Sequence, residues 1–197
     1  KVTDAQIQSA IDILNEDFTA TNSEVPGNIS TYYKALIGSV DIEFRLAKLD
    51  PQGNVTTGID RVVANGICNN TSGGGSIAAN CPVKETAPTW NPENYLNIWI
   101  INDVYGGTTN YSTTSGWAFL SSSVPNINRD EDGIVYNHIF LGREGSSEVD
   151  QFSGDMARVF THEVGHYLNL KHTHTSWCNG GADDEVADTP PVKYNNC

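Results

Sequence analysis

Residues 162–172 read HEVGHYLNLKH, and the rest of the chain is arranged around this stretch. On an α-helix, His162 and His166 are four residues apart and project from one face, so both imidazoles can bind one metal ion. His172 lies ten residues after His162, and a continued helix would turn it away from that face. Asn169 tolerates the left-handed backbone that ends a helix and reverses the chain. We therefore predict that the helix ends near Asn169 and that His172 returns to the metal.

Three histidines predict a zinc ion with a catalytic role. Three neutral imidazoles leave the fourth position of Zn²⁺ open to water, which is typical of hydrolytic zinc sites. Glu163 would lie beside that open position, where its carboxylate can take a proton from water and pass it to the leaving amine. The motif therefore predicts peptide-bond hydrolysis with Glu163 as the general base.

The stretch and its surroundings resemble a known family of peptidases. The pattern HExxHxx(G/N)xxH is that of the metzincin clan of zinc endopeptidases, and the text around it is similar to the pappalysin family. The similar segments are residues 14–18 (LNEDF), 42–47 (IEFRLA), 50–53 (DPQG), 57–61 (TGIDR), 95–99 (YLNIW) and 184–190 (DEVADTP). The resemblance implies an α+β fold: a twisted mixed sheet with an edge strand over the cleft, an N-terminal helix and a zinc-binding active-site helix.

This chain departs from the family pattern in two places. The family usually has Gly where this chain has Asn169, which is a mild change because Asn adopts the same backbone. Metzincins carry a Met-containing turn downstream of the third His, whereas the one Met here, Met156, lies upstream of the motif. We expect residues 1–197 to form a single metzincin-like catalytic domain, mainly its N-terminal subdomain, with the C-terminal subdomain truncated.

Further sites are implied by the resemblance. Pappalysin-like enzymes hold Ca²⁺ just after the zinc helix, and the matching ligands are Asp184, the Ala187 carbonyl and Thr189; oxygen ligands suit this hard cation. The edge strand matches Gly116, Trp117, Ala118 and Phe119, where an extended protein or peptide substrate could add as a further strand. A buried strand without substrate is the alternative for this stretch. The family is secreted and made with a prosegment, and some relatives prefer Arg or Lys after the cleaved bond.

Glu185 is a rival third ligand. In thermolysin-like enzymes a Glu roughly twenty residues beyond the second His binds the zinc, but it comes from a second helix. Residues 183–191 are rich in acids, Thr and Pro and predict a loop, which favours His172. A third alternative is a non-catalytic, metal-stabilised binding fragment, which the missing Met turn favours and Glu163 disfavours.

The composition limits the classes of binding partner and the cellular compartment that we expect for this chain. The net charge of −13 argues against nucleic acid and anionic membrane surfaces. No apolar stretch is long enough to span a membrane. Four cysteines without CxxC spacing favour disulfides in an extracellular protein. Pairing of neighbours would join Cys68 to Cys81 and Cys178 to Cys197, although four cysteines allow three connectivities. The oligomeric state is not readable from the sequence.

The remaining elements follow from local patterns. Thr3 and Gln6 form a capping box for a helix over residues 3–17, with apolar residues at helical spacing. Strands are predicted over residues 40–46, 95–102, 116–120 and 134–141, and a tight turn over residues 50–53. Ser153 is the predicted cap of the zinc helix. Its inner face is predicted to carry Met156, Val159, Phe160, Val164 and Tyr167.

Overall fold

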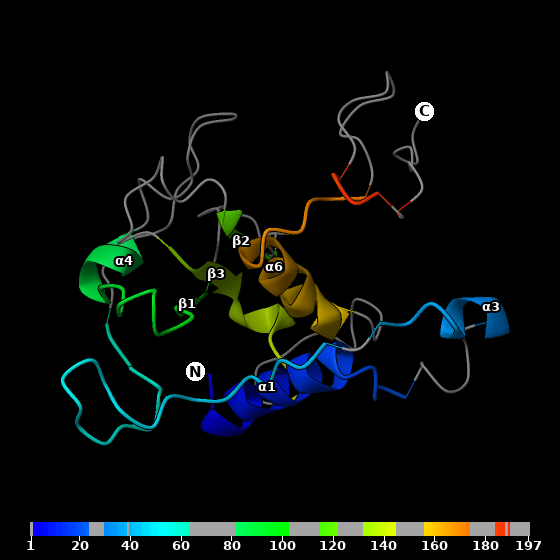
Figure 1. Ribbon diagram of the computed structural model, residues 1–197. Coiled ribbons are helices and arrows are strands. Elements are labelled where there is room, and N and C mark those ends of the chain that lie inside the picture. The colour runs from blue at the N-terminus through cyan, green and yellow to red at the C-terminus, as the bar shows by residue number, and fades with distance from the viewer. Residues whose placement is uncertain are drawn as a thin grey trace, which may run out of the picture.

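The computed structural model describes residues 2–23, 30–38, 40–63, 82–102, 115–121, 132–144, 156–173, 184–187 and 189. The helices among them are α1 (Asp4–Phe18), α3 (Thr31–Lys34), α4 (Pro82–Thr86) and α6 (Val159–Tyr167). The strands are β1 (Ile98–Ile101), β2 (Gly116–Ala118) and β3 (Ile134–Asn137), and two 3-10 turns are η4 (His138–Phe140) and η5 (Met156–Arg158). Figure 1 shows α1 and α6 packed beside each other next to the sheet, with α4 at the sheet's other side. None of the described helices has the length and apolar character needed to cross a bilayer.

The described strands form one mixed sheet in the order β1-β3-β2. β3 is central and fully buried, β1 runs parallel to it and β2 antiparallel. This confirms the predicted α+β class with a mixed sheet. The strand predicted over residues 134–141 is half the expected length, because Asn137 accepts a hydrogen bond from the Ile139 amide (3.2 Å) and the chain turns into η4.

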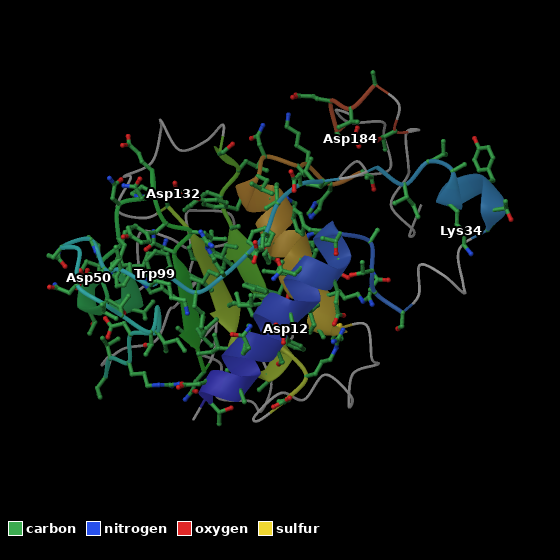
Figure 2. The ribbon with its side chains drawn as sticks, turned by 60° about the horizontal axis from the view of Figure 1, so that its bottom comes forward. Asp12, Lys34, Asp50, Trp99, Asp132 and Asp184 are labelled. Carbon is green, nitrogen blue, oxygen red and sulfur yellow. The ribbon has the colours of Figure 1, made fainter. Side chains whose placement is uncertain are left out.

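The two faces of the sheet carry different layers. Trp99, Val135 and Trp117 are in register across the three strands and share one face, which α4 covers. Trp99 lies on the side of the sheet away from α1 and α6 (Figure 2). Ile134 and Tyr136 point to the other face and pack in the main core with α1 and α6. β3 is therefore apolar on both faces, as expected of a buried central strand.

Helix α1 begins as its sequence predicts. Thr3 is the N-cap, and its hydroxyl accepts from the Gln6 amide at 3.1 Å. The Gln6 side chain is fully buried, and its amide nitrogen donates to the carbonyls of His138 (2.8 Å) and Leu141 (3.1 Å). Ile13, which the helical pattern did not single out, is buried as well. Gln6 thus connects α1 to the turn that follows the central strand.

The prediction of a strand over residues 40–46 is wrong. This segment is extended and passes alongside α1 (Figure 1), but it forms no strand. Val40 and Ile42 remain exposed, so the alternating pattern has no second layer to cover it. Phe44 alone is anchored: its ring packs on Phe18 at 4.8 Å between centroids, and its backbone exchanges two hydrogen bonds with the Asn15 amide (2.8 and 2.9 Å). A side-chain amide replaces the neighbouring strand there.

The turn over residues 50–53 forms as predicted. The Gly53 amide donates to the Asp50 carbonyl at 2.9 Å, and Gly53 has φ of 83°. The four cysteines and Ser153, the predicted cap of the zinc helix, lie outside the described residues.

Candidate metal centre

The end of α6 is built by Asn169. Its φ is 75°, in the left-handed region, and its amide donates to the His166 carbonyl at 2.8 Å. The next amide, that of Leu170, donates to the Gly165 carbonyl at 2.9 Å. These two bonds define a Schellman motif with Asn169 at the C′ position. Leu170 also packs over the bare α-carbon of Gly165, where an added Cβ would lie 3.7 Å from its Cδ1. The predicted helix end is therefore confirmed.

The reversed chain brings the three predicted histidines together. His172 Nε2 lies 3.1 Å from His162 Nε2 and 3.0 Å from His166 Nε2. Two nitrogens bound tetrahedrally to one Zn²⁺ at about 2.0–2.1 Å lie about 3.3 Å apart, so the spacing is close to that of a zinc site. Within the described part of the chain, these histidines are the one group of His, Cys, Asp and Glu side chains with converging ligand atoms.

The tautomer of His166 fits metal binding. Its Nδ1 lies 2.7 Å from the Leu170 carbonyl oxygen, which can only accept a hydrogen bond. Nδ1 therefore carries the proton, and in the neutral ring Nε2 presents a lone pair to the centre. Leu170 is held in place by the Schellman motif. The residues that end the helix therefore also orient the His166 ring; they are Gly165, His166, Asn169 and Leu170.

Glu163 directly follows the first predicted ligand on α6 and is buried. It is 6 % exposed, although it is an acid on a helix that reaches the surface. Burial raises the pKa of its carboxyl to about 7, and a hydrogen bond with the backbone of Ala118 in β2 opposes the rise. Tyr136 of β3 is fully buried, and burial together with the nearby Glu163 charge raises the pKa of its phenol. The acid predicted as general base is thus partly desolvated and tied to the edge strand.

Glu185 takes no part in the described cluster. Its carboxylate pairs with Lys171, the residue before the third histidine. The described geometry therefore brings His172, and not Glu185, to the other two histidines. Asp184 is buried, and its Oδ1 accepts from the Val186 amide at 3.1 Å. Figure 2 shows Asp184 in a loop beyond the end of α6. Ala187 and Thr189 lie in the same loop, and the calcium site remains a prediction.

The predicted substrate strand lies at the edge of the sheet. β2 pairs with β3 on one side and has no described strand on the other. Gly116 must be glycine, since a Cβ there would lie 2.4 Å from the Tyr136 ring and 2.7 Å from the Val135 carbonyl oxygen. Trp117 and Phe119 share one face with their rings in edge-to-face contact at 5.4 Å. β2 is half-buried at this edge, and the substrate contact and the alternative of a buried strand without substrate both stay predictions.

Two residues near the site were not found from the sequence. Lys84 of α4 is buried, with Nζ 4.6 Å from the centre of the Trp99 ring and 4.7 Å from that of Trp117. Asp17 of α1 accepts a hydrogen bond from Thr161, which directly precedes His162. Both contacts join residues far apart in the chain, so no local pattern signals them.

The described fold and centre define the class of protein. An α-helix against a mixed sheet, two histidines one helical turn apart and a third after a left-handed helix end are the features of a metzincin-like metallopeptidase domain. The comparisons with known proteins agree. The profile of the pregnancy-associated plasma protein-A family, Peptidase_M43, matches residues 80–196. The chain therefore belongs to the Peptidase_M43 (pappalysin) family, as the motifs predicted.

Solved structures and curated relatives support this assignment. Mature mirolysin of Tannerella forsythia, solved with a cleaved peptide, is 32 % identical with a TM-score of 0.72, and the match covers 96 % of this chain and 65 % of that one. Promirolysin of the same organism gives 32 % identity and a TM-score of 0.74, over 96 % of this chain and 57 % of that one. Extracellular metalloprotease 1 of Coccidioides posadasii is 33 % identical over 111 residues, which are 50 % of this chain and 32 % of that protein. An extracellular metalloprotease of Sordaria macrospora is 32 % identical over 99 residues, 48 % of this chain and 30 % of that protein. The chain thus matches about a third of the curated relatives' length and less than two thirds of the mirolysin chains.

Proposed function

We propose that this chain is the catalytic part of a secreted zinc endopeptidase that cuts extended peptides. The observation that carries the proposal is the convergence of three imidazoles, with Nε2 of His162 at 3.1 Å and Nε2 of His166 at 3.0 Å from Nε2 of His172. The buried Glu163 follows His162 on the helix. A purely structural zinc site would be closed by a fourth protein ligand and would need no such acid. The open three-histidine set favours hydrolysis instead.

His162, His166 and His172 are the proposed zinc ligands, and Glu163 is the proposed general base. Zinc supplies a Lewis acid that activates water near neutral pH and polarises the carbonyl of the scissile bond. Glu163 takes a proton from the attacking water and delivers it to the leaving amine. Burial suits both halves of that task, because a carboxylate with a raised pKa takes up a proton more readily than an exposed one, and a pKa near neutrality still lets the carboxyl return that proton as an acid.

Substrate binding is assigned to the edge strand. A peptide in extended form would pair with the backbone of β2, and the side to which it adds is the one that has no described neighbour. Gly116, Trp117, Ala118 and Phe119 are the proposed contact residues. The Ala118 backbone bonds Glu163, so the bound peptide and the general base would share one short strand. The solved mirolysin complex with a cleaved peptide supports this part of the proposal. The net charge of −13 agrees with Arg or Lys after the cleaved bond.

Further properties follow from the relatives. Extracellular metalloproteases among them support secretion, and promirolysin supports synthesis as a zymogen. We further propose Ca²⁺ in the loop that holds Asp184, Ala187 and Thr189, where the buried Asp184 carboxylate and the oxygens of Ala187 and Thr189 suit this hard cation.

The test compares Glu163→Gln with Glu185→Gln as a matched control. Both changes remove one carboxylate charge with little change of shape, and both residues lie near the zinc motif. We expect Glu163→Gln to keep one zinc per chain and to lose cleavage of a denatured protein mixture by at least about a hundredfold. We expect Glu185→Gln to keep both zinc and cleavage. Cleavage that survives Glu163→Gln would refute the general-base assignment, and zinc loss in Glu185→Gln would favour the thermolysin-like ligand set.

A further inference from the structure

The start of the zinc helix lacks a cap of its own. α6 begins at Val159 after η5, and its N-cap residue is Arg158, whose side chain makes no capping hydrogen bond. The first turn, Val159 to Thr161, carries no acid either. The predicted cap, Ser153, lies five residues upstream of this N-cap position. A helix N-terminus normally gains from an acceptor or a negative charge nearby, because its first amides have no partners within the helix.

Asp17 brings a negative charge from another helix to the described start of α6. It is in the last turn of α1, and its side chain is 10 % exposed. Its Oδ2 accepts from the Thr161 hydroxyl at 2.6 Å, and its Oδ1 lies 3.1 Å from the Arg158 guanidinium. The Asn22 side-chain amide donates to the same Oδ1 at 3.0 Å and helps to fix the carboxylate. The carboxylate therefore holds both the N-cap residue and the third residue of α6.

We propose that Asp17 is a positioning residue for the metal centre. Thr161 is bonded covalently to His162, so the Asp17 contact fixes the backbone from which the first ligand projects. The second and third ligands are held from the other end of α6, by the Asn169 turn. The helix is nine residues long, and both of its ends are thus held by contacts within the protein. This inference rests on the proposed zinc site but not on the proposed peptidase activity.

The test uses the hydroxyl of Thr161, because its removal leaves the core intact. Thr161→Val keeps the shape and loses the bond to Asp17, whereas Thr161→Ser keeps the bond. Glu16→Gln is the matched control: Glu16 is the neighbour of Asp17 in α1, but its carboxylate is bonded to Arg143 (2.7 and 3.1 Å) and not to α6. Asp17→Asn is the second variant for the contact itself.

The readout is the dissociation constant for Zn²⁺, measured by competition with a chromophoric chelator, with thermal unfolding of the metal-free proteins alongside. Loss of groups that orient metal ligands typically weakens binding about 10- to 100-fold. Asp17 acts on the residue before a ligand and not on the ligand itself, so we expect a smaller effect. We expect Thr161→Val and Asp17→Asn to raise the dissociation constant at least about threefold. Thr161→Ser and Glu16→Gln should stay below that limit, even where Glu16→Gln loses as much thermal stability.

A rise of less than threefold in both Thr161→Val and Asp17→Asn would overturn the proposal. An equal rise in Glu16→Gln would overturn it too, since the effect would then follow general stability. Peptide cleavage by the unaltered protein is recorded in the same series. A protein that binds zinc tightly, loses affinity as described and cuts no peptide would refute the proposed function and leave this inference standing.

Discussion

Replacement of Asn169 tests how the third histidine reaches the metal. At φ of 75°, an alanine would have its Cβ too close to the following carbonyl oxygen, which costs about 1–2 kcal/mol. Glycine has no Cβ and adopts this backbone freely, although it loses more freedom on folding. We therefore expect Asn169→Ala to lower the free energy of unfolding by about 1 kcal/mol and Asn169→Gly to change it by less than about 0.5 kcal/mol.

The assay is denaturant unfolding with and without zinc. A loss of 1 kcal/mol changes the ratio of folded to unfolded chains about fivefold and shifts the melting temperature of a chain of this size by about 2–4 °C. Because ligand binding adds to folding stability, the gap between Asn169→Ala and the unaltered protein should widen in zinc. In Asn169→Ala the strained turn lets the end of the helix fray when no zinc is present. Zinc binding needs the turn formed, so the variant gains less stability from zinc than the unaltered protein does. Equal stability of the Ala variant and the unaltered protein, or an equal loss in the Gly variant, would refute this account of the helix end.

Three further predictions concern the stability of the fold and the edge strand. Arg143 holds the pKa of the Glu16 carboxyl below its usual range, so the pair stabilises the fold above the unfolded-state pKa, and this stabilisation is lost as pH falls through the folded-state pKa. Arg143→Gln should therefore reduce the fall in the free energy of unfolding between about pH 6 and about pH 3. The reduction should be less than about 1 kcal/mol, because the pair is partly exposed. Lys84→Met should lower stability by about 1–2 kcal/mol through loss of three cation–π contacts, with Lys84→Arg as the rescuing control in thermal melts. Gly116→Ala should displace the edge strand and raise KM for peptides more than it lowers kcat, because its Cβ would meet Tyr136; unchanged kinetics would contradict this.

The convergence of the three histidines could be predicted from the sequence because it is local. His162, His166, Asn169 and His172 lie within eleven residues, and helix geometry with one left-handed residue fixes their relation. The Thr3 cap and the turn at Gly53 are local in the same way. These predictions needed no knowledge of the rest of the fold.

The contacts that support the site could not be predicted, because they join distant segments. Asp17 meets Thr161 across 144 residues, and nothing near either position signals the bond. The failed strand over residues 40–46 has the same origin: its alternation is real, but whether a pattern becomes a strand depends on a partner elsewhere in the chain. The Phe44 backbone makes its two hydrogen bonds with the Asn15 side chain and not with a neighbouring strand.

X-ray absorption at the zinc edge, on the protein loaded with one zinc per chain, tests the central claim most directly. The account predicts three imidazole nitrogens at about 2.0–2.1 Å and one further light atom from solvent, with one nitrogen fewer in His172→Ala and no change in Glu185→Gln. A carboxylate of Glu185 in the first coordination sphere, or four protein ligands around the zinc, would contradict the open three-histidine centre.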